Sequence, residues 1–185
     1  AASGLQANVA NGVYRLKLAN TNEAETFGFT FRGQLIIPAN VQWYFETRLK
    51  IPTAITTNQV AVFVLCSTVT DVLDDITRNA WFRLQASMDL LAELDDATTD
   101  TDDQDTGKDL TADTYYVFSI QKMPGGKVQF RVRDASGQKE TLLKEISGAS
   151  FGANNLQPVI LVQKSTGTSQ PAIDVDYVLA IWERI

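Results

Sequence analysis

Apolar and polar residues alternate along much of the chain with a period of two, which is the pattern of half-buried β-strands. Every second residue from Trp43 to Ile51 is apolar except Thr47, and the residues between them are polar or charged. The run 60–66 is almost continuously apolar and predicts a strand buried on both faces. Strands are expected at 13–19, 26–31, 35–37, 41–51, 60–66, 80–86, 90–94, 115–122, 127–133, 139–146, 156–164 and 172–185.

The C-terminal segment 172–185 has the strongest strand pattern. One parity is apolar throughout and comprises Ile173, Val175, Tyr177, Leu179 and Ile181. The other parity begins with Asp174 and Asp176 and then becomes apolar. We therefore expect an interior strand whose second half is buried on both faces and whose two aspartates lie at a solvated end.

One short helix interrupts this β pattern. Asp71–Asn79 (DVLDDITRN) has apolar residues at helical spacing, and Asp71 is a suitable N-cap. Turn signals at 123–126 (MPGG) and 134–137 (DASG) separate later strands. Many short strands with a single short helix predict an all-β fold, an antiparallel β-sandwich or jelly roll. It forms one domain, 13–185, after a small polar N-terminal arm, 1–12.

The net charge of −6 is unevenly distributed. Between positions 89 and 113 there are ten carboxylates and one lysine, so the acidity is local. The centre of this segment is expected to be a solvated acidic loop that keeps molecules apart. Its aspartates are also weak candidates for a calcium site, since calcium takes six to eight oxygen ligands. These candidates are Asp100, Asp102, Asp103 and Asp105, although their spacing does not match an EF-hand.

The composition excludes several functions. The chain has no histidine, which excludes Ser-His and Cys-His catalysis and His-ligated zinc within one chain. Cys66 lies in an apolar run and is expected to be a buried, unreactive thiol. No basic cluster supports nucleic-acid binding, and no apolar run has the length of a membrane span. The first twelve residues lack the pattern of a secretion signal.

Two segments resemble concanavalin A-like lectin/glucanase domains. Trp43–Pro52 (WYFETRLKIP) resembles the F-E-x-R-[IL]-K-[ILV]-P strand of that family, and Val175–Trp182 (VDYVLAIW) resembles its closing VDYVRVW strand. The acidic segment 95–107 and the ending 156–178 are similar to concanavalin A-like structural proteins of tailed bacteriophages. The resemblance implies a jelly roll of two curved sheets and a component of a phage virion.

Glucanases of this fold share an E-x-D-x-(x)-E strand, and its nearest match here is incomplete. Glu93 and Asp95 share a face, but Ala97 or Thr98 stands where the last glutamate is needed. Without this proton donor the leaving group is not protonated, so we expect no enzyme and no catalytic residue. Asp174 and Asp176 also share a face, but the family does not use this position for catalysis.

Other residues have structural interpretations. Glu46 alternates with Arg48 and Lys50 and is expected to form a cross-strand ion pair on an exposed face. Trp43, Trp81 and Trp182 are candidates for sugar stacking, but each lies in an apolar strand, which favours the core.

The leading functional hypothesis is a non-enzymatic structural protein of a phage virion, either a capsid decoration or a head-fibre subunit. Its expected partners are capsid or other virion proteins and further copies of the chain, with docking through the arm 1–12. The alternatives are a carbohydrate-binding module, with a host glycan as ligand, and a degenerate glucanase. No cofactor is expected apart from the weak calcium candidates.

Overall fold

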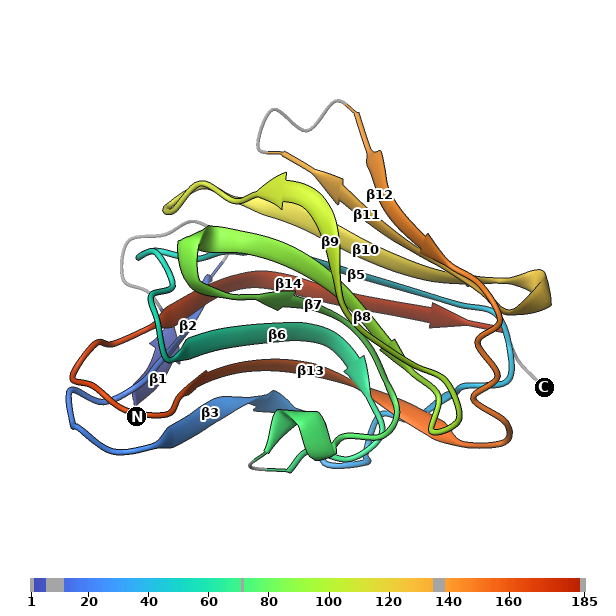
Figure 1. The fold of residues 1–185 in the computed structure, drawn as a ribbon, viewed down its shortest axis with the longest axis horizontal. Coiled ribbons are helices and arrows are strands. Elements are labelled where there is room, and N and C mark those ends of the chain that lie inside the picture. The colour runs from blue at the N-terminus through green and yellow to red at the C-terminus, as the bar shows by residue number, and fades with distance from the viewer. Residues whose placement is uncertain (1, 6–11, 71, 135–138, 184–185) are drawn as a thin grey trace.

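The protein folds as a two-layered antiparallel β-sandwich, as the sequence predicts. The structure is a computed structural model that describes residues 2–5, 12–70, 72–134 and 139–183. Two curved sheets, here called sheet A and sheet B, lie face to face, and the strand pairs within each run antiparallel (Figure 1). Short 3-10 turns at Leu73–Asp75 (η1), Ala86–Met88 (η2) and Pro124–Gly126 (η3) are the helical elements of this part of the chain.

Sheet A contains both chain ends and the two segments that resemble the concanavalin A-like family. Its order is β1 (Ala2–Leu5), β2 (Tyr14–Lys17), β14 (Ala172–Trp182), β5 (Trp43–Lys50), β10 (Tyr116–Met123), β11 (Lys127–Arg133) and β12 (Thr141–Ile146). β5 and β14 pair directly, from Asp174 opposite Lys50 to Trp182 opposite Trp43. The expected arm, 1–12, contributes β1 to this sheet, and its residues 1 and 6–11 lie outside the described part.

Sheet B forms the second layer. Its order is β3 (Glu25–Thr30), β13 (Asn155–Lys164), β6 (Gln59–Cys66), β7 (Asn79–Leu84), β8 (Asp89–Asp95) and β9 (Asp100–Asp109), and β4 (Ile37–Pro38) pairs with β13. The core between the sheets includes a cluster of phenylalanine rings. Phe118 of sheet A packs against Phe63 and Phe82 of sheet B, with ring centroids 4.7 and 5.3 Å apart.

The prediction of a helix at 71–79 is wrong, because only the single turn η1 forms there. Val72 and Ile76, which flank η1, have extended backbones, and Asp71 lies outside the described residues. Two helical turns are too short to be stable alone, so packing decides the conformation. Leu73 and Ile76 are buried in an apolar cluster on the outer face of sheet B, and the chain follows that surface.

The expected burial of β14 on both faces is also wrong. A β-bulge shifts the register between Val175 and Tyr177, so the residues that face the core change parity there. Val178, Ala180 and Trp182 pack against the core after the bulge. Leu179 and Ile181 are 40% and 55% exposed on the outer face of sheet A.

The acidic loop expected around 100–109 is a strand. These residues form β9, which pairs with β8 at the edge of sheet B through two register shifts. Most of its aspartates are exposed. Charged side chains and irregular pairing at a sheet edge disfavour the addition of another strand. The anti-association role expected of the loop therefore stays a prediction for β9.

Candidate functional site

The outer face of sheet B is partly covered by residues 67–70 and 72–78, the cap segment, which connects β6 to β7. Apolar side chains of the cap segment and of sheet B pack together in one cluster between them. The buried members of this cluster are Val62, Cys66, Leu73, Ile76, Trp81, Val159 and Leu161. The cap segment therefore forms one wall of the groove that lies beside it on this face.

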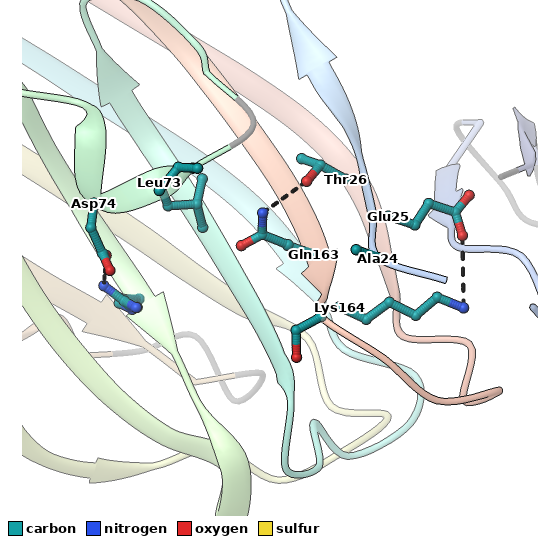
Figure 2. Close-up of a pocket in the computed structure, with 10 residues that line it drawn as sticks. Ala24, Glu25, Thr26, Leu73, Asp74, Gln163 and Lys164 are labelled. Atoms are coloured by element: carbon teal, nitrogen blue, oxygen red, sulfur yellow. Dashed lines mark hydrogen bonds and ion pairs between the residues drawn. The ribbon is translucent and has the colours of Figure 1, made fainter. Parts of the chain in front are cut away.

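A groove of about 600 Å³ lies on this face, between the cap segment and strand β3 (Figure 2). Its lining comprises Ala24, Glu25, Thr26, Val72, Leu73, Asp74, Arg83, Gln163, Lys164 and Ser165. The Gln163 amide donates from Nε2 to Thr26 Oγ1 at 2.9 Å, which orients both groups on neighbouring strands. On the opposite side the apolar side chains of Val72 and Leu73 belong to the cap segment.

Arg83 connects the groove to a buried carboxyl. Its Nη1 donates to Asp74 of the cap segment at 2.9 Å and lies 3.4 Å from Glu93 Oε2. Asp74 is exposed, whereas Glu93 is only 2% exposed. The Arg83 guanidinium therefore interacts with an exposed carboxylate and with a buried carboxyl at the same time.

Glu93 has a strongly perturbed pKa. Burial of the carboxyl raises its pKa to about 7, because Arg83 and Trp81 offset only part of the desolvation. Asn79 Nδ2 donates to Glu93 Oε1 at a long 3.4 Å. A buried carboxyl that titrates near neutral pH beside a groove is a recognised signature of functional sites.

Two buried polar atoms beside Glu93 have no hydrogen-bond partner within the described part of the chain. They are Asn79 Oδ1 and Arg83 Nε, and Arg83 Nε lies 3.9 Å from Asp103 Oδ1. Buried polar atoms without partners are rare, because each costs roughly 1–3 kcal/mol. The region behind the groove is therefore a polar cluster that the fold alone does not satisfy.

Lys164 shapes the other end of the groove. It is 1% exposed, and its Nζ donates to the carbonyl oxygens of Ala19 and Thr21 at 2.6 Å each. Glu25 Oε2 lies 3.8 Å from the same ammonium (Figure 2). This lysine holds the loop after β2 against the end of β13.

The two carboxylates of the incomplete glucanase motif, Glu93 and Asp95, both lie on β8 but in different surroundings. Glu93 is buried on the outer face of sheet B, whereas Asp95 ends the strand, is half-buried and accepts a hydrogen bond from Ala97 N at 2.6 Å. The next residue, Asp96, lies in the loop after β8. Asp96 accepts backbone N–H groups from Thr98, Thr99 and Ser150, which lowers its pKa and ties two loops together. Asp96 therefore has a structural role.

The four calcium candidates do not form a suitable site. Asp103 accepts from Gln85, and Asp105 accepts from the backbone of Gly107. Burial raises the pKa of Asp102 to about 6, with a further contribution from the hydrogen bond and the like charge of Asp100. Within the part of the chain that the structure covers, no group of three or more acidic, cysteine or histidine side chains could hold a metal ion. Calcium binding through these four aspartates stays a prediction.

The acidic pair of β14 is not solvated, in contrast to the expectation. Asp174 is 2% exposed and accepts two hydrogen bonds from Arg15 of β2, at 2.5 and 2.6 Å. Asp176 pairs with Arg48 of β5. The partners are distant in sequence but adjacent in sheet A, so both aspartates hold strands together.

Glu46 forms the ion pair expected of it, with Arg133 of β11 at 2.7 Å. It also accepts hydrogen bonds from the hydroxyls of Tyr44 and Tyr177, both at 2.5 Å. The donors lower the pKa of Glu46, and the raised pKa values of both tyrosines show that their protons are retained. This cluster lies on the outer face of sheet A.

Other predictions from the sequence are confirmed. Cys66 is buried, and burial raises the pKa of its thiol to about 12. Trp43 and Trp81 are buried, and Trp182 packs against the core. Sequence reasoning missed Gln163, Thr26 and Arg83, because only strand register brings them to one groove. Within the described residues, no helix has the length and apolar character needed to cross a membrane.

No protein-family model matches the sequence, and no curated protein is significantly similar to it. Solved structures, in contrast, share its fold. The carbohydrate recognition domain of Emp47p has 9% sequence identity and a TM-score of 0.66, covering 98% of this chain and 87% of that domain. The VIP36 exoplasmic/lumenal domain bound to Ca²⁺ and Man3GlcNAc has 8% identity and a TM-score of 0.61, covering 100% of this chain and 84% of that one.

An enzyme has the same fold. The alginate lyase from Klebsiella pneumoniae has 8% identity and a TM-score of 0.56, covering 97% of this chain and 84% of that one. At these identities the similarity establishes the fold alone. The chain has a concanavalin A-like sandwich, and its resemblance to phage structural proteins stays a prediction.

Proposed function

We propose that the protein is a carbohydrate-binding module and that it binds a glycan in the groove on the outer face of sheet B. The main support is the composition of that groove, where amide, guanidinium, carboxylate and hydroxyl groups meet apolar side chains. Similarity in fold to the Emp47p carbohydrate recognition domain and to glycan-bound VIP36 supports the same class of ligand.

The groove offers complementary groups for sugar hydroxyls. A hydroxyl donates one hydrogen bond and accepts others, so it pairs with a carboxylate and a guanidinium placed side by side. Asp74 and Arg83 are held 2.9 Å apart in this way. Gln163 and Thr26 offer an amide and a hydroxyl on the facing side, and Val72 provides an apolar surface for the C–H face of a ring.

The charges in the groove favour a neutral glycan. Arg83 is paired with Asp74 and faces Glu93, and Lys164 lies 3.8 Å from Glu25. No cation of the lining is left without an acidic neighbour. An anionic sugar would gain little Coulomb energy here and would lose its hydration, so hydroxyl-rich neutral sugars are the better ligands.

Binding without hydrolysis is part of the proposal. A retaining glycosidase needs two carboxyls about 5–5.5 Å apart, one of them a proton donor. Glu93 has a pKa suited to proton donation, but it is buried beneath the cap segment. Asp74 is engaged by Arg83. These features support a role in recognition. A location on a phage virion stays a prediction and is compatible with glycan recognition.

A panel of neutral and acidic oligosaccharides tests the proposal. We expect at least one neutral oligosaccharide to bind, and Gln163→Ala to weaken it about tenfold, because a hydrogen bond to a sugar hydroxyl is lost. Gln129→Ala is the matched control, since Gln129 is a half-buried glutamine on the outer face of sheet A. Absence of binding across the panel, or equal losses in the two variants, would contradict the proposal.

A further inference from the structure

A second, smaller pocket lies at the end of sheet A where β2, β5 and β14 meet. Its volume is about 350 Å³. The lining comprises Arg15, Lys17, Asn20, Pro52, Thr53, Thr168, Gln170 and Ala172. It contains two cations, two amides and two hydroxyls, and no carboxylate. This is an unusual environment in a chain of net charge −6.

The ion pairs around this pocket leave one positive charge in excess. Arg15 is paired with the buried Asp174, as described above. Lys50 lies 2.5 Å from Asp113 and 3.9 Å from Asp174. Among the described residues, Lys17 has no ion pair.

Lys17 lies next to Arg15 on the same face of β2. Alternate residues of a strand project to the same side, so the two cationic side chains line one wall. Both hydrogen bonds of Arg15 to Asp174 come from Nε and Nη2, which leaves Nη1 as a donor. A ligand here thus meets an unpaired ammonium beside a guanidinium that is already held in place.

Several hydrogen bonds join the two loops that contribute Asn20, Thr168 and Gln170 to the pocket. Leu18 N donates to Pro171 O at 3.2 Å. Asn22 Oδ1 accepts from Gly167 N at 2.8 Å and from Thr166 Oγ1 at 3.1 Å. These hydrogen bonds tie the two loops together, which reduces the ordering that a ligand must impose on binding.

We propose that this pocket binds a singly charged oxyanion carried by a hydroxyl-rich molecule, namely the carboxylate or sulfate ester of an acidic sugar. Lys17 and Arg15 bind the anion, because charge-assisted hydrogen bonds to carboxylate and sulfate are the strong ones. Asn20, Thr53 and Gln170 donate to or accept from neighbouring hydroxyls. A single excess charge favours one anionic group over a doubly charged phosphate.

This site is separate from the groove on sheet B. Ala24 and Ser165 line the groove, whereas Asn20 and Thr168 of the same two loops line the pocket. The two loops lie between the sites. Anion binding at the pocket therefore does not depend on glycan binding in the groove, and either can fail without the other.

Amide chemical-shift titrations on the full chain test the inference. The probes are glucuronate, glucose 6-sulfate and glucose, each at up to roughly 10 mM, where weak binding is measurable. We expect one or both anions to shift amides near Lys17, Thr53 and Gln170, and glucose to leave them unchanged. A response to glucuronate alone assigns a carboxylate, a response to the sulfate alone assigns a sulfate ester, and a response to both assigns either monoanion.

Two lysine variants complete the test. Lys17→Gln should weaken anion binding about tenfold, because one charge-assisted hydrogen bond is lost. Lys144→Gln removes the same charge from a half-buried lysine of β12 and should change nothing. The inference is overturned if neither anion shifts these amides, if glucose shifts them equally, or if the two variants bind alike.

Discussion

At the scale of single residues, Glu93 is the most unusual group in the molecule. The sequence pattern placed it on the same strand face as Asp95, in the incomplete glucanase motif. In the structure it is buried beneath the cap segment, with contacts of 3.4 Å to Asn79 and Arg83. Its burial follows from Leu73 and Ile76 packing over sheet B, and no local pattern in 89–95 contains that information.

The pKa of Glu93 predicts a specific dependence of stability on pH. Because the folded pKa is raised from 4.5 to about 7, the folded state holds this proton where the unfolded chain has lost it. Its contribution to stability is complete below pH 4.5 and is lost as pH rises through 7, a change of roughly 3 kcal/mol. Glu93→Gln should remove this loss, so the variant should become progressively more stable than the wild type between pH 5 and pH 8.

Urea unfolding across that pH range measures the effect. Glu46→Gln is the control, because the pKa of Glu46 is lowered. A lowered pKa stabilises the fold above the unfolded pKa and is lost as pH falls, which is the opposite sign. A difference between Glu93→Gln and wild type that stays constant from pH 5 to pH 8 would rule out the raised pKa.

Sequence reasoning correctly predicted the burial of residues whose neighbours in the sequence are apolar. Cys66 and Trp81 lie among apolar neighbours, and both are buried. Asp174 was misplaced because its partner Arg15 is 159 residues away. The groove residues Thr26 and Gln163 become neighbours only through strand register. Burial of apolar runs is readable from sequence, whereas pairing between distant strands is not.

At the scale of elements, β14 shows how one bulge changes the meaning of a sequence pattern. The alternation in 172–182 was regular, yet the faces exchange after Val175. A bulge inserts one residue without a partner, and every later side chain then changes face. The strand could be inferred from its alternation and from the family-like segment 175–182, but its pairing with β5 and the bulge could not.

The exchange of faces predicts the effects of substitutions in β14. Leu179→Lys should change the free energy of unfolding by no more than about 0.5 kcal/mol, because Leu179 is exposed. Val178→Lys should cost roughly 3 kcal/mol, since Val178 packs against the core and a charge would be buried. Chemical denaturation compares them, and a larger loss for Leu179→Lys would show that the faces do not exchange.

The acidic strand β9 shows how composition can mislead. Clustered aspartates suggested a loop, but side chains at a sheet edge can remain in water while the backbone pairs. Gly28 of β3 gives the converse case, a residue unremarkable in sequence that packing requires. A Cβ atom there would lie 2.4 Å from the backbone oxygen of Ile160 and 2.9 Å from Leu161 Cα, so a side chain at this position would require the backbone of β13 to shift.

At the scale of the whole molecule, the two outer faces of the sandwich differ. On sheet A, Glu46, Asp174 and Asp176 are each paired across strands. Sheet B has the cap segment and the groove. Cross-strand ion pairs stabilise strand order, whereas a groove that combines apolar surface with a few convergent polar groups suits ligand recognition. Sheet B is therefore the face to which we assign glycan binding.

Amide chemical-shift mapping with the strongest-binding neutral oligosaccharide of the panel tests this assignment most directly. The account predicts shifts on the outer face of sheet B, at 24–26, 72–74, Arg83 and 163–165, which line the groove. The chemical shifts of the amides at 44–48 and 129–133 of sheet A should not change. Shifts confined to sheet A would contradict the account, as would a titration in which no amide moves.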